Sequence, residues 1–98
     1  VSVTHAFRDG IHRYTGTFLL PHSCFSVDES GVYEKDKITI AFHVEDRIAT
    51  AKTCVDIVTR YPFTVLVEAP EKTPVVLEAC IFAVAQRICG VLPSSWNG

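Results

Sequence analysis

Four cysteines and four histidines are the residues of this 98-residue chain whose side chains are best suited to chemistry. An even number of cysteines in a short chain allows two disulfide bonds. A cysteine beside a histidine can act as a nucleophile with its base, and the two residue types together are common zinc ligands. Their spacing along the chain decides which of these uses we expect.

Two disulfide bonds are the expected use of Cys24, Cys54, Cys80 and Cys89. We predict that Cys80 and Cys89 share one helix, on which a spacing of nine residues separates their Cα atoms by ~13 Å. A disulfide requires Cα atoms within ~7 Å, so these two cysteines should not bond to each other. The preferred pattern is therefore Cys54–Cys80 with Cys24–Cys89, and the alternative is Cys54–Cys89 with Cys24–Cys80. Four buried, reduced thiols in a cytoplasmic protein are the competing hypothesis.

Metal binding and catalysis have weaker support in the sequence. No CxxC or CxH spacing occurs, so we predict no metal site. His22 and Cys24 are two residues apart, on one face of an extended segment, but no third group to orient them is evident. His5 and His12 are expected to be partly buried against Tyr14 and its aromatic neighbours rather than to bind a metal. The glycines are scattered, so no phosphate loop and no cofactor are predicted.

Composition excludes several classes of protein. The net charge of −2 and the pI of about 6 argue against a nucleic-acid binder that depends on basic charge. An apolar content of 48% with 20% charged residues excludes intrinsic disorder. We predict one α+β domain over residues 1–98. The chain begins with Val1 and contains no methionine, which indicates a processed product of a larger precursor.

Residues 1–20 predict a β-hairpin. Asp9-Gly10 favours a two-residue type I′ turn, because both central residues of that turn need a positive φ. Such a turn pairs Arg8 with Ile11. It places the apolar side chains on one face of the hairpin and the threonines and arginines on the other.

The middle of the chain alternates between strand and helix patterns. Residues 21–35 are expected to be irregular, with a turn at 28–31. Residues 37–44 and 63–67 alternate apolar and polar side chains, which is typical of half-buried strands. Over 44–60 the apolar residues follow the spacing of an amphipathic helix; they are Val44, Ile48, Ala51, Val55 and Val58.

A second helix is predicted after Thr73, a suitable N-cap, with Pro74 at the first helical position. Gly90 is its expected end, close to Cys89 or Val91. The resulting order is β-β-(β)-β-α-β-α. We therefore predict a two-layer α+β sandwich, in which a mostly antiparallel sheet of four to five strands packs two helices on one face.

Two surfaces are candidates for binding. The second helix is more apolar than one packed face requires, so we expect another chain or self-association to cover it; the candidate contact residues are Val75, Glu78, Phe82 and Gln86. This helix is too short for a membrane span, although contact with a membrane surface stays an option. The outer face of the sheet lacks the aromatic residues that stack on single-stranded RNA, so no nucleic-acid partner is expected; its polar residues include Arg8, Arg13, Lys37 and His43.

These observations predict a non-enzymatic binding or assembly domain that acts outside the cell through protein–protein contact by its second helix. One alternative is a secreted toxin or effector subunit, comparable in build to those of fungal killer toxins, that acts on a target cell or membrane. Another is a small enzyme that depends on His22 and Cys24. A cytoplasmic location is the alternative if the thiols are reduced.

Overall fold

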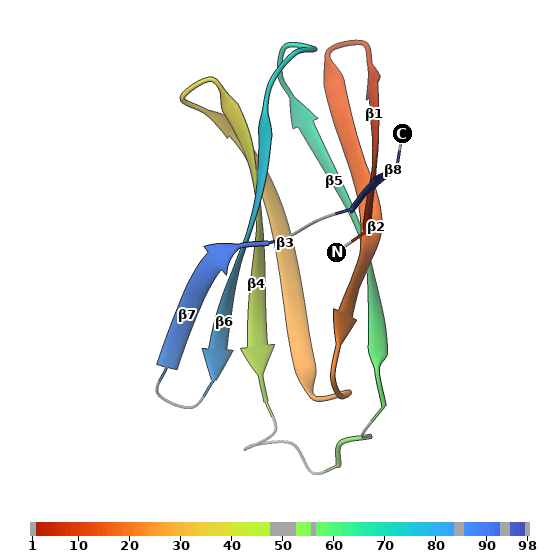
Figure 1. The fold of residues 1–98 in the computed structure, drawn as a ribbon, viewed down its shortest axis with the longest axis vertical. Coiled ribbons are helices and arrows are strands. Elements are labelled where there is room, and N and C mark those ends of the chain that lie inside the picture. The colour runs from red at the N-terminus through yellow and green to blue at the C-terminus, as the bar shows by residue number, and fades with distance from the viewer. Residues whose placement is uncertain (1, 48–52, 56, 84–85, 93–94, 98) are drawn as a thin grey trace.

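Strands make up all the regular secondary structure in the described part of the chain. The computed structural model describes residues 2–47, 53–55, 57–83, 86–92 and 95–97. Within these ranges the chain forms two layers of strands that run along the long axis of the molecule (Figure 1). The strands are β1 (Ser2–Arg8), β2 (Ile11–Leu20), β3 (Phe25–Glu34), β4 (Lys37–Asp46), β5 (Thr59–Glu68), β6 (Val75–Ala83), β7 (Gln86–Val91) and β8 (Ser95–Asn97).

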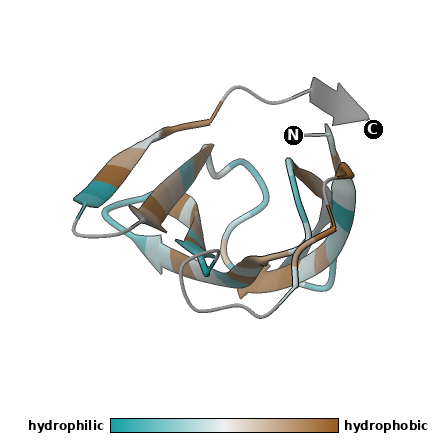
Figure 2. Ribbon diagram, turned by 90° about the horizontal axis from the view of Figure 1, so that it is seen from below, coloured by the Kyte–Doolittle hydropathy of each residue, from teal (hydrophilic) through white to brown (hydrophobic). Residues whose placement is uncertain are grey.

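The strands form two four-stranded sheets, sheet A in the order β5-β2-β1-β8 and sheet B in the order β3-β4-β6-β7. The pairs β1–β8 and β4–β6 are parallel and the other pairs are antiparallel. The end strands β3 and β5 contact each other across the two layers. We call this side the closed edge, and the side at which β7 and β8 end the two sheets the open edge. Figure 2 gives the end-on view, in which apolar and polar residues alternate along the strands.

The first hairpin confirms the prediction for residues 1–20. Asp9 and Gly10 have φ values of 53° and 81°, and Arg8 pairs with Ile11 as the two-residue turn requires. The side chains on the inner face include the buried Val3 and His12. The turn and the hydrophobic pattern thus agree on one register.

The core lies between β4 of sheet B and β2 and β5 of sheet A. The alternation predicted over 37–44 and 63–67 is confirmed, because every second residue of these segments is buried. The ring of Phe42 lies 4.9 Å from that of Phe63 and 5.2 Å from that of Phe18. These contacts join the two sheets through aromatic side chains.

The α+β prediction is wrong, because the described residues contain no helix. The segment predicted as the second helix is the hairpin of β6 and β7, with β6 an interior strand between β4 and β7. An interior strand that is partly covered on both faces is apolar on both, so its sequence lacks strict alternation and resembles a buried helix. Thr73 does not cap a helix; its hydroxyl donates to the carbonyl oxygen of Pro70 at 2.6 Å and closes a turn.

The first predicted helix is also wrong. Strand β4 continues to Asp46, and the described residues Val55 and Val58 are exposed and not helical. Ile48 and Ala51, which complete the predicted apolar stripe, lie outside the described residues. Among the described residues, no helix is long and apolar enough to cross a membrane.

The turn predicted at 28–31 is wrong as well, because β3 runs straight through it. The chain turns instead at Lys35 and Asp36, whose φ values are 52° and 61°. Gly31 has a different role at the closed edge. A Cβ atom there would lie 2.5 Å from Val65 Cγ1 and 2.6 Å from Val67 Cγ2, so the glycine allows β3 and β5 to approach each other.

Candidate functional site

Both disulfide bonds expected from the cysteine count are present, but both predicted pairings are wrong. Cys24 bonds to Cys54, with Cα atoms 5.5 Å apart, and Cys80 bonds to Cys89, with Cα atoms 4.1 Å apart. Cys80 and Cys89 are direct partners in the β6–β7 ladder. The exclusion of a Cys80–Cys89 bond rested on their separation along a helix. It does not apply to a hairpin, in which the two cysteines face each other across the strands. No reduced thiol remains, which contradicts the competing hypothesis.

Strand β7 is the most unusual element of the structure. All six of its residues are exposed, including Ile88 at 65% and Val91 at 71%. Its hydrogen-bonded neighbour is β6, and no described strand lies on its other side. Burial of apolar side chains is what normally fixes a strand to a domain. Here the disulfide bond and the backbone ladder hold β7 in place instead.

The backbone of β7 offers hydrogen-bonding groups outward. A Cα separation of 4.1 Å for Cys80 and Cys89 is typical of a non-hydrogen-bonded antiparallel pair, in which the N–H and C=O groups point away from the partner strand. Leu92, three residues further along, donates its N–H to the carbonyl of Leu77 at 2.8 Å, which fits the same alternation. The backbone groups of Arg87, Cys89 and Val91 therefore face away from β6.

The single charged residue of β7 does not protect this edge. The guanidinium carbon of Arg87 lies 5.5 Å from the ring centroid of Phe82, its cross-strand neighbour. The Phe82 ring in turn stacks on His43 of β4 at 4.2 Å. Arg87 thus lies over the outer face of its own sheet rather than beyond the edge.

The predicted partner-contact residues fall on both faces of the β6–β7 hairpin. Val75 is on the inner face, partly buried against the core. Glu78 and Phe82 are on the outer face of β6, and Gln86 is the first residue of β7. The structure therefore places these residues in one hairpin but not on one surface.

The predicted polar face is divided between the two sheets. Arg8 and Arg13 lie on the outer side of sheet A, and Arg8 forms an exposed ion pair with Asp9 at 3.6 Å. Lys37 and His43 lie on the outer side of sheet B. In a sandwich these two sides face away from each other, so the four residues do not share one binding face.

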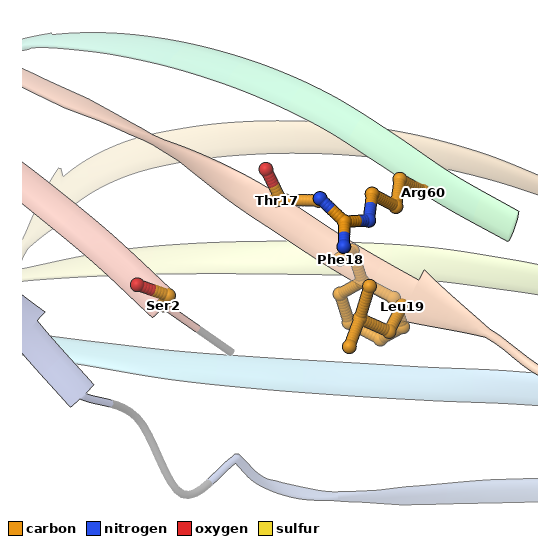
Figure 3. A pocket seen from close by; sticks show the side chains of 5 residues that line it. All are labelled: Ser2, Thr17, Phe18, Leu19 and Arg60. Atoms are coloured by element: carbon orange, nitrogen blue, oxygen red, sulfur yellow. The ribbon is translucent and has the colours of Figure 1, made fainter. Parts of the chain in front are cut away.

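A hollow of about 420 Å³ lies over the end of β2, beside β1 and β5. In Figure 3 the side chain of Arg60 reaches from β5 across β2. The side chains that line the hollow offer hydroxyl groups, apolar surface and one guanidinium, without a carboxylate, histidine or thiol for acid–base or nucleophilic work; they are Ser2, Thr17, Phe18, Leu19 and Arg60.

Three groups form a partly buried hydrogen-bonded chain near the turn of the β1–β2 hairpin. His12, 1% exposed, places Nε2 2.8 Å from the carbonyl oxygen of Pro70 and Nδ1 2.8 Å from Nε2 of His5. Because a carbonyl only accepts, His12 carries its proton on Nε2 and accepts from His5. The His5 ring also stacks on Tyr14 at 4.8 Å. We call His5, His12 and the Pro70 carbonyl the histidine chain.

Burial, with a smaller contribution from His12, lowers the pKa of His5 from its usual value of 6.5. Burial also raises the pKa of Tyr14. The neutral form of the His5 ring is therefore favoured in the folded protein. Sequence reasoning identified the burial of the two histidines, but their acceptor is 58 residues away from His12 in sequence and no pattern marks it.

His22 lies beside the Cys24–Cys54 disulfide. Its Nδ1 accepts the backbone N–H of Cys24 at 3.1 Å, and its Nε2 lies 3.8 Å from a carboxylate oxygen of Asp46. The predicted pair of His22 and Cys24 is thus brought together. With its sulfur bonded to Cys54, Cys24 has no thiol to act as a nucleophile in this state.

The chain matches no known protein-family model, no curated protein and no solved structure.

Proposed function

We propose that the protein is a non-enzymatic binding module that takes up an extended segment of another protein along strand β7. The observation that carries the proposal is that β7 is fully exposed yet covalently fixed to its sheet. Ordering a strand costs conformational entropy, which the burial of its side chains normally offsets. No side chain of β7 is buried, so this offset is missing here. A rigid edge reduces the entropy that binding has to offset.

The character of the edge supports this use. Exposed edge strands are normally protected by a proline, a bulge or a charge that points along the edge. β7 contains no proline, and its one charged residue, Arg87, lies over Phe82. The outward backbone groups of Arg87, Cys89 and Val91 are placed to pair with an added strand, as in β-augmentation.

The side chains indicate what the added strand should carry. Ile81 and Ile88 form a cross-strand pair on the inner face and are 42% and 65% exposed, so an apolar side chain of the partner would cover them. Gly90, on the same face, has no atom within 4 Å of the position of a Cβ, which leaves room for a large neighbour. On the outer face Arg87 favours an acidic residue.

The two disulfide bonds favour an oxidising environment, and we propose that the protein acts outside the cytoplasm. The toxin alternative relied on an apolar helix for attack on a membrane or for subunit pairing. That segment is the β6–β7 hairpin, so the feature on which the toxin alternative depended is not a helix.

The test begins with a displayed library of random nine-residue peptides, selected against the whole oxidised chain. Val91→Pro removes one outward N–H group at an edge position where proline is tolerated, and Val91→Thr is the matched control that keeps it. We expect a selected peptide to bind Val91→Pro at least tenfold more weakly than the wild type, and Val91→Thr within about twofold. The circular dichroism of both variants checks the fold. Failure to enrich any peptide, or equal binding to Val91→Pro, would overturn the proposal.

A further inference from the structure

We propose that reduction of the Cys24–Cys54 disulfide converts this corner of the sandwich into a zinc site formed by His22, Cys24 and Cys54. A ligand atom of each of these residues lies within 4.8 Å of those of the other two. Among the described residues, these three side chains are the group that could together hold a metal ion. The proposal is independent of the binding function assigned to β7.

The donor set fits zinc. One imidazole nitrogen and two thiolates are ligands that Zn²⁺ takes in tetrahedral sites. With Zn–S bonds of about 2.3 Å, two sulfurs on one tetrahedral ion are about 3.8 Å apart. The Cα atoms of Cys24 and Cys54 are 5.5 Å apart, so small rotations of the two side chains suffice to open the sulfurs to that separation.

Asp46 is placed to orient the histidine. The Nδ1 atom of His22 accepts a hydrogen bond from the backbone N–H of Cys24, so it lies next to Cys24 and gives up this bond when it binds the ion. Its Nε2 atom is 3.8 Å from the Asp46 carboxylate. A carboxylate on the second nitrogen of a metal-binding histidine fixes its tautomer and raises its basicity. The side chains of His22 and Asp46 are 16% and 23% exposed, so the imidazole and the carboxylate keep limited contact with solvent.

The two segments are held together by more than the disulfide bond. Ser23 donates its N–H to the carbonyl of Val55 at 3.1 Å, and its hydroxyl oxygen accepts the N–H of Val55 at 2.7 Å. Arg47 donates its N–H to the carbonyl of Cys24 at 2.9 Å. The two hydrogen bonds between Ser23 and Val55 flank both cysteines, and the bond from Arg47 fixes Cys24 to the end of β4, so we expect the two thiols to stay adjacent after reduction.

The chemistry consists of two balanced steps. A dithiol reductant delivers two electrons and two protons to the S–S bond, which yields the thiols of Cys24 and Cys54 and leaves the reductant as its own disulfide. Zn²⁺ then forms two Zn–S bonds and releases the two thiol protons, while His22 binds as a neutral ligand. In the oxidised protein the sulfurs are bonded to each other, so the site does not exist.

The experiment uses Co²⁺ as a spectroscopic probe and Zn²⁺ as its competitor. Cys80→Ser/Cys89→Ser serves as the parent, because it retains this disulfide alone; a phosphine reduces it and is itself converted to the phosphine oxide. We expect the reduced parent to bind one Co²⁺ with thiolate charge-transfer and tetrahedral d–d bands, and Zn²⁺ to abolish these bands and raise the thermal midpoint. The oxidised parent should show no bands.

Three variants of this parent locate the site. Cys24→Ser/Cys54→Ser should lose the bands, and His22→Ala should weaken Co²⁺ binding at least tenfold. Asp46→Asn, which tests a positioning role, should weaken it by about 10- to 100-fold while the bands keep their tetrahedral form. The absence of bands in the reduced parent, their presence in the oxidised parent, or unchanged binding by His22→Ala would overturn the proposal.

Discussion

The two edges of the sandwich are each held by a disulfide bond, but the bonds act in different surroundings. At the closed edge, Cys24–Cys54 joins the start of β3 to the segment that leads into β5, and Cys24 is only 8% exposed. Tyr61 of β5 also donates to the carboxylate of Glu29 of β3 at 2.9 Å. At the open edge, Cys80–Cys89 fixes a strand that has no buried residue.

This difference shows that a disulfide can either reinforce a core or replace one. The closed edge is stabilised by packing, a charge-assisted hydrogen bond and a covalent link that act together. The open edge depends on its covalent link, its ladder and the contact of the exposed Arg87 with Phe82, without buried apolar side chains on β7. Loss of a bond should therefore affect the whole protein at the closed edge and only one strand at the open edge.

The largest effect is expected from Cys24→Ala/Cys54→Ala. The disulfide joins residues 30 apart, and the loop it closes in the unfolded chain has an entropic value of about 3.5 kcal/mol. Urea unfolding followed by circular dichroism should show a loss of that order in the free energy of unfolding. A loss below about 1 kcal/mol would mean that the closed edge does not rely on this bond.

Gly31→Ala should have the next largest effect. The added methyl group would collide with Val65 and Val67 and force β3 and β5 apart, at a cost of about 1–3 kcal/mol. Gly90→Ala on β7 is the matched control, because nothing lies within 4 Å of a Cβ atom there. Urea midpoints should fall for Gly31→Ala and stay almost unchanged for Gly90→Ala. Equal shifts in the two variants would contradict the distinction between the edges.

Acidification should destabilise the protein through the histidine chain, which lies between the two edges. The folded state lowers the pKa of His5 below 6.5, so the unfolded state binds a proton more readily. The stability contributed by neutral His5 is therefore complete above pH 6.5 and declines as the pH falls toward the lowered pKa. The loss comes from the burial that disfavours the charged ring, because His5 keeps its Nε2 proton and its hydrogen bond to His12 when it is protonated.

Urea midpoints measured between pH 8 and pH 5 test this expectation. His5→Gln retains an N–H donor for His12 but does not titrate, so its midpoint should change less over this range than that of the wild type. If the two proteins respond to pH in the same way, the histidine chain is not the cause.

The smallest effect on global stability is expected from Cys80→Ala/Cys89→Ala. Because no residue of β7 is buried, release of this strand should cost the core less than about 1 kcal/mol. Amide hydrogen exchange should instead show a loss of protection at Gly90 and Leu92, with the amides of β4 unchanged. A global loss as large as that of the Cys24–Cys54 variant would show that the open edge also supports the core.

The sequence predicted the parts of the fold in which local signals agree. Asp9-Gly10 and the alternation around it determined the first hairpin and its register. The alternation over 37–44 and 63–67 was equally reliable, because each of these segments buries one face and exposes the other. The cysteine count likewise predicted two disulfide bonds.

One error arose where partial burial on two faces removed the strand period. The segment Val75–Ala83 lies between two strands and is apolar on both sides except at Glu78, so periodicity could not separate a strand from a helix there. The pairing of Cys80 with Cys89 was excluded only because of that assignment. The meeting of His12 with Pro70 and of His22 with Asp46 depends on tertiary structure, which no local pattern contains.

The order of strands in the sheets also has a consequence for how the chain folds. Among the described strands, only the hairpins β1–β2, β3–β4 and β6–β7 pair neighbours in sequence, whereas β2–β5, β4–β6 and β1–β8 join distant segments. Contacts between distant segments require large loops to close before any stabilisation is gained, which slows folding to milliseconds or seconds in β-sandwiches. We therefore expect the local hairpins to form early and the two sheets to be completed late, with β7 and β8 added after the core.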